Sequence, residues 1–226
     1  MAVAHDGAAN VSSTIAGATS ITLNKATAGS DRCAVAHTAA YPNGSVTALT
    51  YAGTAMSVMV SQSSADTSST SSLHRFLAPT TASSAVVWTI TGTTGQGAVG
   101  VTSYSGVHQT TPLGNTQQAL GVGVSTHPSL TVTSAVGEMC MDALNVWNPP
   151  TRTVGAGQTQ IFNLTDTDAE TSGNASYEAG AASVVMDWTL SETVTNYYNH
   201  VAAALLPSVG ATTTNPGWYS NAGGWS

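Results

Sequence analysis

The feature that most constrains this fold is a two-residue alternation between large apolar side chains and small or polar ones. The alternation is clearest over residues 56–61, 86–91, 120–125 and 184–191. Successive side chains of a β-strand point to opposite faces, so this pattern predicts strands with one face in a core and the other in water. Such strands are typical of antiparallel sheets, which can leave one face solvated.

Turn signals separate the alternating runs at short intervals. The strongest is Pro42-Asn43-Gly44, because Asn and Gly tolerate the positive φ angles of tight turns. No convincing helical pattern occurs, and no fixed-period repeat is found, which disfavours solenoids and propellers. The sequence therefore predicts an all-β protein, a two-sheet antiparallel sandwich that is jelly-roll-like.

The chain divides into three parts by composition. We expect an N-terminal arm over residues 1–17, a β-sandwich domain over 18–207 and a C-terminal tail over 208–226. The tail is rich in Gly, Thr, Asn and Ser but carries three large aromatic residues, Trp218, Tyr219 and Trp225. Large aromatic side chains supply much of the free energy when a segment docks. The tail is therefore expected to pack on its own sandwich or on a neighbouring subunit.

Charge is scarce, and this excludes several classes of function. Only 7% of the residues are charged, with 4 Lys and Arg against 11 Asp and Glu, and the net charge is -7. A chain with so few cations is not expected to bind nucleic acid, whose phosphates its net negative charge repels. The longest apolar run, 201–206, is far shorter than the ~18 residues of a membrane span. Residues 1–6 have neither the basic nor the apolar region of a signal peptide, so secretion by that route is not expected.

No catalytic constellation is found, and we expect no enzyme activity, no cofactor and no metal site. The serines of residues 100–106 do not fit the G-x-S-x-G pattern of a nucleophile elbow. The six histidines share no spacing typical of metal ligands. Asp166, Asp168 and Glu170 resemble the start of a calcium loop, but the expected Gly and closing Glu are missing. A solvated acidic loop is the favoured reading there, with calcium binding left open.

Two cysteines are too few for a disulfide framework. Cys33 and Cys140 each lie in an apolar, strand-like run. Buried free thiols are the favoured reading, and a disulfide between two sheets remains open.

Aromatic residues near polar ones form a candidate glycan-binding surface. Trp147 lies close to Asn145, Asn148 and Arg152, and the Tyr197-Tyr198 pair is a second candidate. An aromatic ring beside amide and hydroxyl groups offers a platform for a sugar. The alternative, which the sequence favours, is that all three are ordinary aromatic residues at the end of a sandwich.

Several motifs occur in an order that is similar to that of a known group of proteins. The segments that carry the similarity are residues 1–6, 19–23, 29–32, 46–53, 76–79, 97–107, 108–114, 134–138, 154–160 and 178–188. Together they resemble β-sandwich proteins that are common in tailed-phage genomes and in some bacterial surface proteins. The resemblance covers residues 2–207 and rests on turns and core strands, with departures at Cys33 and His37.

This resemblance implies a non-enzymatic virion structural protein, made in the host cytoplasm. We expect a capsid decoration, or cement, protein that docks on the major capsid protein or another virion protein through its terminal arms. The docking residues would include Trp218, Tyr219 and Trp225, and a homo-oligomer is expected, with a trimer favoured. Two alternatives stay open. One is a glycan-binding or adhesive sandwich on a tail fibre or cell surface, and the other is a subunit of an extracellular fibre that donates a strand to its neighbour.

Overall fold

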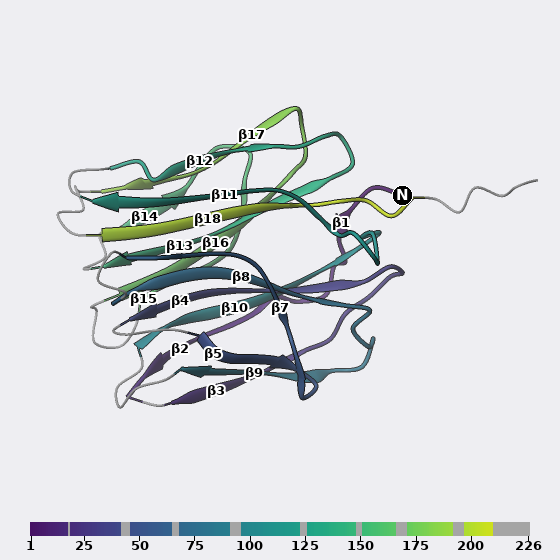
Figure 1. The fold of residues 1–226 in the computed structure, drawn as a ribbon, viewed down its shortest axis with the longest axis horizontal. Coiled ribbons are helices and arrows are strands. Elements are labelled where there is room, and N and C mark those ends of the chain that lie inside the picture. The colour runs from purple at the N-terminus through teal and green to yellow at the C-terminus, as the bar shows by residue number, and fades with distance from the viewer. Residues whose placement is uncertain are drawn as a thin grey trace, which may run out of the picture.

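The computed structural model describes residues 1–17, 19–41, 46–64, 68–90, 96–122, 126–147, 151–165, 171–191 and 197–209 (Figure 1). Within these ranges the regular structure consists of β-strands alone, paired antiparallel, which confirms the predicted all-β sandwich class. The strands are β1 (Ala4–His5), β2 (Val11–Ala16), β3 (Ser20–Lys25), β4 (Cys33–Tyr41), β5 (Val46–Tyr51), β6 (Thr54–Ala55), β7 (Ser57–Ser63), β8 (Thr70–Leu77), β9 (Ser84–Ile90), β10 (Gln96–Ser105), β11 (Leu113–Val122), β12 (Ser129–Thr133), β13 (Met139–Trp147), β14 (Arg152–Val154), β15 (Thr159–Thr165), β16 (Thr171–Ala179), β17 (Ser183–Leu190) and β18 (Tyr197–Leu205).

The strands form four stacked layers. The first inner sheet has the order β1-β10-β4-β8-β7, with β2 also paired to β10, and the second inner sheet has the order β11-β18-β13-β16-β15. An outer sheet, β3-β9-β5-β6, covers the first inner sheet, and another, β12-β17-β14, covers the second (Figure 1). The predicted pair of sheets thus describes each half of the molecule, and the whole consists of two sandwiches packed back to back.

The two halves share one topology. In chain order, β3, β4, β5, β7, β8, β9 and β10 correspond to β12 to β18, while β11 lies beside β18 as β2 lies beside β10. If the strands of the second half are numbered one to eight, its sheets have the orders 1-8-3-6-5 and 2-7-4, which is the interleaving of a jelly roll. Across the middle of the molecule, β7 lies beside β11 and β2 lies beside β15, as an approximate two-fold axis along the strands requires.

The central strands of the inner sheets are buried on both faces. Every residue of β4 and of β13 except the last is buried, because one face packs on an outer sheet and the other on the opposite inner sheet. Between the inner sheets, Leu73 and Tyr104 pack with Met141 and Leu205. These strands therefore lack the apolar and polar alternation that the outer strands show, as in the pattern eBeBiBeB of β17.

Small residues and hydrogen bonds to carbonyl groups join the inner sheets. His37 Nδ1 donates to the Asp142 carbonyl at 2.8 Å, and Ser71 Oγ donates to the Ala143 carbonyl at 2.9 Å. The sheets approach so closely at Gly173 that a Cβ there would lie 2.5 Å from the Cβ of Ala98. Pairing the buried polar groups across the interface avoids the free-energy cost of leaving them without partners.

The N-terminal segment belongs to the first inner sheet. Residues 1–17, expected as an arm, contain β1 and β2, and both strands pair with β10. The buried Lys25 ammonium group donates to the Ala9 carbonyl at 2.8 Å, which holds the connection between these strands. The N-terminal amine donates to the Ser208 carbonyl at 2.9 Å, so both ends of the described chain lie at the same end of the molecule (Figure 1).

The alternation expected over residues 56–61 is interrupted at Val58. Its side chain is 58% exposed, while Met59 and Val60 are both buried. The pairing of β7 with β8 shifts register between Val58 and Val60. Such a bulge places an extra residue in one strand and reverses the facing of the residues beyond it.

Candidate functional site

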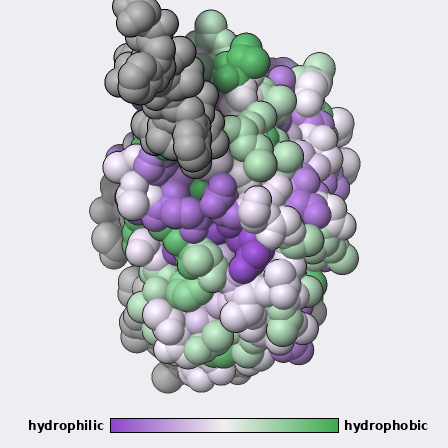
Figure 2. Space-filling model, turned by 90° about the vertical axis from the view of Figure 1, so that its right-hand side faces the viewer, coloured by the Kyte–Doolittle hydropathy of each residue, from purple (hydrophilic) through white to green (hydrophobic). Residues whose placement is uncertain are grey.

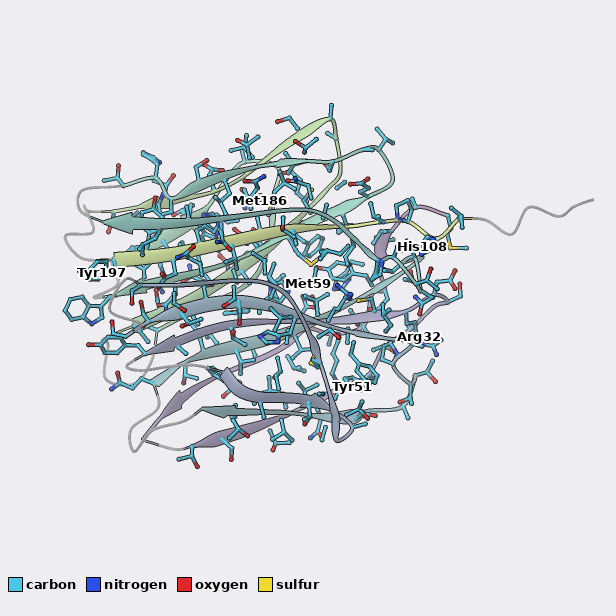
Figure 3. The ribbon with its side chains drawn as sticks, viewed as in Figure 1. Arg32, Tyr51, Met59, His108, Met186 and Tyr197 are labelled. Atoms are coloured by element: carbon cyan, nitrogen blue, oxygen red, sulfur yellow. The ribbon has the colours of Figure 1, made fainter. Side chains whose placement is uncertain are left out.

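A small cavity opens at the end of the molecule opposite the termini. It has a volume of about 100 Å³ and is lined by Tyr41, Ser68, Ser69, Trp147 and Tyr197. Tyr41 is the last residue of β4, Trp147 is the last of β13, and Tyr197 is the first of β18. Figure 3 labels Tyr197 at this end and His108 at the other. We call these five residues the aromatic pocket.

The aromatic pocket lies between the two halves of the molecule. The rings of Tyr41 and Trp147 stack, with centroids 5.9 Å apart and planes inclined by 28°. Both side chains are half-buried, and they occupy equivalent positions at the ends of corresponding strands. Neither half alone contains the stacked pair, because each contributes one ring.

The polar side of the aromatic pocket is held by neighbouring hydrogen bonds. Ser69 Oγ accepts from Asn199 Nδ2 at 2.6 Å, and the Ser69 backbone amide donates to Ser64 Oγ at 3.0 Å. Ser64 Oγ also lies 3.3 Å from Ser68 Oγ. These contacts fix the two lining serines at the edge of the aromatic surface. No lining residue in the described part of the chain is charged.

The structure brings together two of the three residues predicted as a glycan surface. Trp147 and Tyr197 line the same cavity, whereas Tyr198 faces the other side of β18. There Tyr198 packs against the outer-sheet core around Trp188, with its ring over Gly121. Adjacent residues of a strand point to opposite faces, so the Tyr197-Tyr198 pair does not form one surface.

The polar neighbours that the sequence placed near Trp147 have structural roles. Asn145 Nδ2 donates to the Ala40 carbonyl at 3.0 Å, and Asn145 Oδ1 accepts from Thr171 Oγ1 at 2.6 Å. Arg152 donates to Asn163 and Asn174 in the second half, and burial lowers the pKa of its guanidinium to about 10. Asn148 lies outside the described residues.

Sequence reasoning missed Tyr41, although a signal was present. Tyr41 precedes the turn sequence Pro42-Asn43-Gly44, and Trp147 precedes Asn148-Pro149-Pro150. In each half, therefore, an aromatic residue ends an inner strand directly before a short segment that contains Pro and Asn. Unless the two halves are known to share one topology, nothing in the sequence links Tyr41 to Trp147, which are far apart in the chain.

The end that carries the termini has a different character. A cavity of about 190 Å³ is lined by Asp31, His108, Gln109, Thr110, Ser208 and Val209. Figure 2 looks onto this end and shows hydrophilic residues gathered near its middle, with apolar ones above and below them. Met1, Val136 and Val209 are 69%, 91% and 77% exposed. Among the described residues, five large apolar side chains are exposed, and three of them thus belong to the terminal segments or to the turn that bonds Val3.

A buried acidic group lies inside the second sandwich. Asp142 accepts hydrogen bonds from Ser176, from Trp188 Nε1 at 2.7 Å and from His200 Nε2 at 3.0 Å. Asp142 and His200 are both fully buried. The carboxylate therefore binds donors of its own core and is closed to a substrate in this structure.

The structure describes the two cysteines, but it does not describe the acidic loop or the aromatic tail. Both cysteines are free and buried, with Cys33 between the inner sheets and Cys140 in the outer core of the second half, so they do not pair. In the described ranges, no three His, Cys, Asp or Glu side chains converge as metal ligands would. Asp166, Asp168 and Glu170, the candidate calcium ligands, lie outside the described residues, and so do Trp218, Tyr219 and Trp225.

No helix in the described part of the chain is long and apolar enough to cross a membrane.

Comparison of the chain with known proteins found no relative. No protein-family model matches the chain, and no curated protein and no solved structure matches it.

Proposed function

We propose that the protein is a non-enzymatic structural component of a bacteriophage virion. It attaches to the particle, as a capsid decoration protein, through the end that carries its termini. The partner in this proposal is the major capsid protein or another virion protein, and the protein acts as a homo-oligomer, with a trimer favoured. The observation that carries the proposal is the convergence of both ends of the described chain, where the Met1 amine lies 2.9 Å from the Ser208 carbonyl oxygen.

Exposed apolar side chains at the terminal end support attachment there. Met1, Val136 and Val209 are each more than two-thirds exposed, and burying such side chains favours association. The tail, with Trp218, Tyr219 and Trp225, continues the chain from this end and would add large aromatic contacts. Of the two N-terminal strands, β1 lies at this end, where Ala4 pairs with Ser105, the last residue of β10.

The fold and the scarcity of charge fit the same role. Jelly rolls are common in viral capsid proteins and in lectins, an analogy that supports a role without defining it. Because only 7% of the residues are charged, attachment would depend weakly on salt. Repeated contacts on an ordered shell would add their free energies.

Co-sedimentation with shells tests this proposal. The full chain is mixed with particles of the encoding phage that lack it, beside a chain ending at Val209 and a Val136→Asp variant. We expect the full chain to bind at a fixed ratio to the shell subunits. Both variants should bind at least about tenfold more weakly, which is the effect of losing a buried anchor.

The matched control is Val185→Asp, on the outer sheet, where Val185 is 48% exposed. This variant should bind as the unmodified chain does. Absence of co-sedimentation, or equal weakening by Val136→Asp and Val185→Asp, would overturn the proposal. Self-assembly of the purified chain into fibres without shells would favour the fibre alternative instead.

A further inference from the structure

The aromatic pocket is the feature that attachment through the terminal end does not use. It lies at the opposite end of the strands, so a particle-bound protein would keep it turned away from the shell. We propose that the aromatic pocket binds a neutral saccharide, with a pyranose ring placed against the Tyr41 and Trp147 rings. This inference does not depend on the virion role, because it concerns a site at the other end of the molecule.

The ring pair provides the apolar part of such a site. Tyr41 and Trp147 stack on each other at 5.9 Å, so no ligand ring fits between them, and their remaining half-buried surface faces the cavity. A pyranose ring has an apolar face of C–H groups, and it gains free energy when that face covers an aromatic ring in place of water. The stacking also holds each ring in place, which reduces the conformational entropy lost on binding.

The polar part of the site is built from hydroxyl groups. Tyr197 brings a phenol to the cavity, and Ser68 and Ser69 bring hydroxyls that neighbouring bonds hold at its edge. A hydroxyl can donate and accept, which is what the hydroxyls of a sugar require of their partners. Pockets of this composition, mostly apolar with a few polar groups, are typical of small-molecule sites.

Charge selects the class of saccharide. Among the described residues that line the cavity none is charged, and the whole chain has a net charge of -7. A phosphorylated or carboxylated sugar would lose hydration without gaining a cationic partner there, which costs free energy. The cavity of about 100 Å³ is small, so it accommodates part of one ring, and the rest of a longer glycan would extend into solvent.

Binding can be measured with the full chain and simple sugars. Saturation-transfer NMR with methyl glycosides of glucose, galactose, mannose and N-acetylglucosamine would identify a ligand. Tryptophan fluorescence titration would then give its affinity, and a Trp147→Phe variant would separate the Trp147 signal from the other four tryptophans. We expect at least one neutral glycoside to bind saturably, and Trp147→Ala to weaken binding by at least about tenfold.

A matched pair of tyrosines controls for general damage. Tyr41→Leu removes a ring of the aromatic pocket, whereas Tyr177→Leu removes a half-buried ring that stacks on His5 near the termini. Both variants are first compared by thermal melting. The proposal predicts weaker binding by Tyr41→Leu alone. It is overturned if no glycoside binds at millimolar concentration, if Tyr41→Leu and Trp147→Ala bind as the full chain does, or if an anionic sugar or a proline-rich peptide is preferred. The co-sedimentation assay with shells tests the virion role separately from saccharide binding, because its variants change the end of the molecule that carries the termini.

Discussion

Asp142 Oδ2 lies 3.0 Å from His200 Nε2 and 2.7 Å from Trp188 Nε1, all inside the core of the second sandwich. The other carboxylate oxygen accepts from the Ser176 backbone amide at 2.7 Å and from its hydroxyl at 2.8 Å. A carboxylate with four donors is well matched to this position, because a buried charge is tolerated only when it is hydrogen-bonded. The inner and outer sheets of this half are connected through it.

We therefore expect Asp142→Asn to destabilise the protein strongly. The amide nitrogen of Asn would face donors, leaving at least one buried group without a partner. The free energy of unfolding should fall by about 3 kcal/mol. Urea unfolding followed by tryptophan fluorescence measures this change. An exposed replacement, Ser183→Ala on β17, should change it by less than about 0.5 kcal/mol, and a similar small effect of Asp142→Asn would contradict the assignment.

Stability should decrease in mild acid because two histidines are buried in the neutral form. Burial lowers the pKa of His37 from 6.5 to about 4, and it lowers the pKa of His74 to about 4 as well. Between pH 6.5 and about 4 the unfolded chain binds these protons and the folded chain does not. The free energy of unfolding should therefore fall with decreasing pH, by up to about 1.4 kcal/mol per pH unit for each histidine.

A histidine substitution tests whether the buried histidines cause this pH dependence of stability. His74→Gln keeps a group that can bond Ser72, whose Oγ lies 2.8 Å from His74 Nε2, but it removes one titrating site. Denaturant unfolding at several pH values should give a shallower slope for this variant. A stability that is flat between pH 6.5 and 4 in the unmodified chain would show that these side chains are not buried.

Gly173→Ala tests the close approach of the inner sheets. The added Cβ would lie 2.5 Å from the Cβ of Ala98 and 3.1 Å from that of Ala39, so the sheets must separate locally. We expect a loss of about 1–3 kcal/mol in the free energy of unfolding, as for other overpacked cores. Combining it with Ala98→Gly should recover part of the loss. If the changes that the two substitutions make in the free energy of unfolding simply add, the two halves are not in contact at this point.

Both thiols should be unreactive in the folded protein. Burial raises the pKa of Cys33 to about 12 and raises the pKa of Cys140. Thiolates are the reactive species, so a thiol reagent should label neither residue until denaturant is added. Counting labelled thiols by mass spectrometry checks this, with Ser183→Cys as an exposed control that should react at once. Fast labelling of either native cysteine would contradict its placement.

The alternation in the sequence marks outer strands such as β9 and β17 and the edge strands β7 and β11 of the inner sheets, whereas the central inner strands do not show it, for one physical reason. An outer strand such as β17 has a wet face, so burial imposes the alternation that the sequence displays. An inner strand such as β4 is buried on both sides, and its polar side chains bond other buried groups, Thr38 with Ser72 of the same half and His37 with both Thr102 and the other half. Ser71 and His37 look like surface residues in the sequence, yet both bond carbonyl groups across the interface.

The candidate site was predictable to the same limited extent. Trp147 and Tyr197 are recognisable as aromatic residues at strand ends, but the ring that completes the pocket comes from the other half of the chain. Only the packing of two jelly rolls brings Tyr41 beside Trp147. The duplication itself escaped detection because it occurs once and shares topology more than residue identity.

The covalent joining of the two halves gives this molecule a freedom that a pair of identical subunits lacks. In a symmetric dimer, the side chains meeting near the axis are the same residue twice, and any ligand there has two equivalent poses. Here one partner is a phenol and the other an indole, because each position could change on its own. A ligand bound beside this pair of rings would therefore contact two different side chains and have a single preferred orientation.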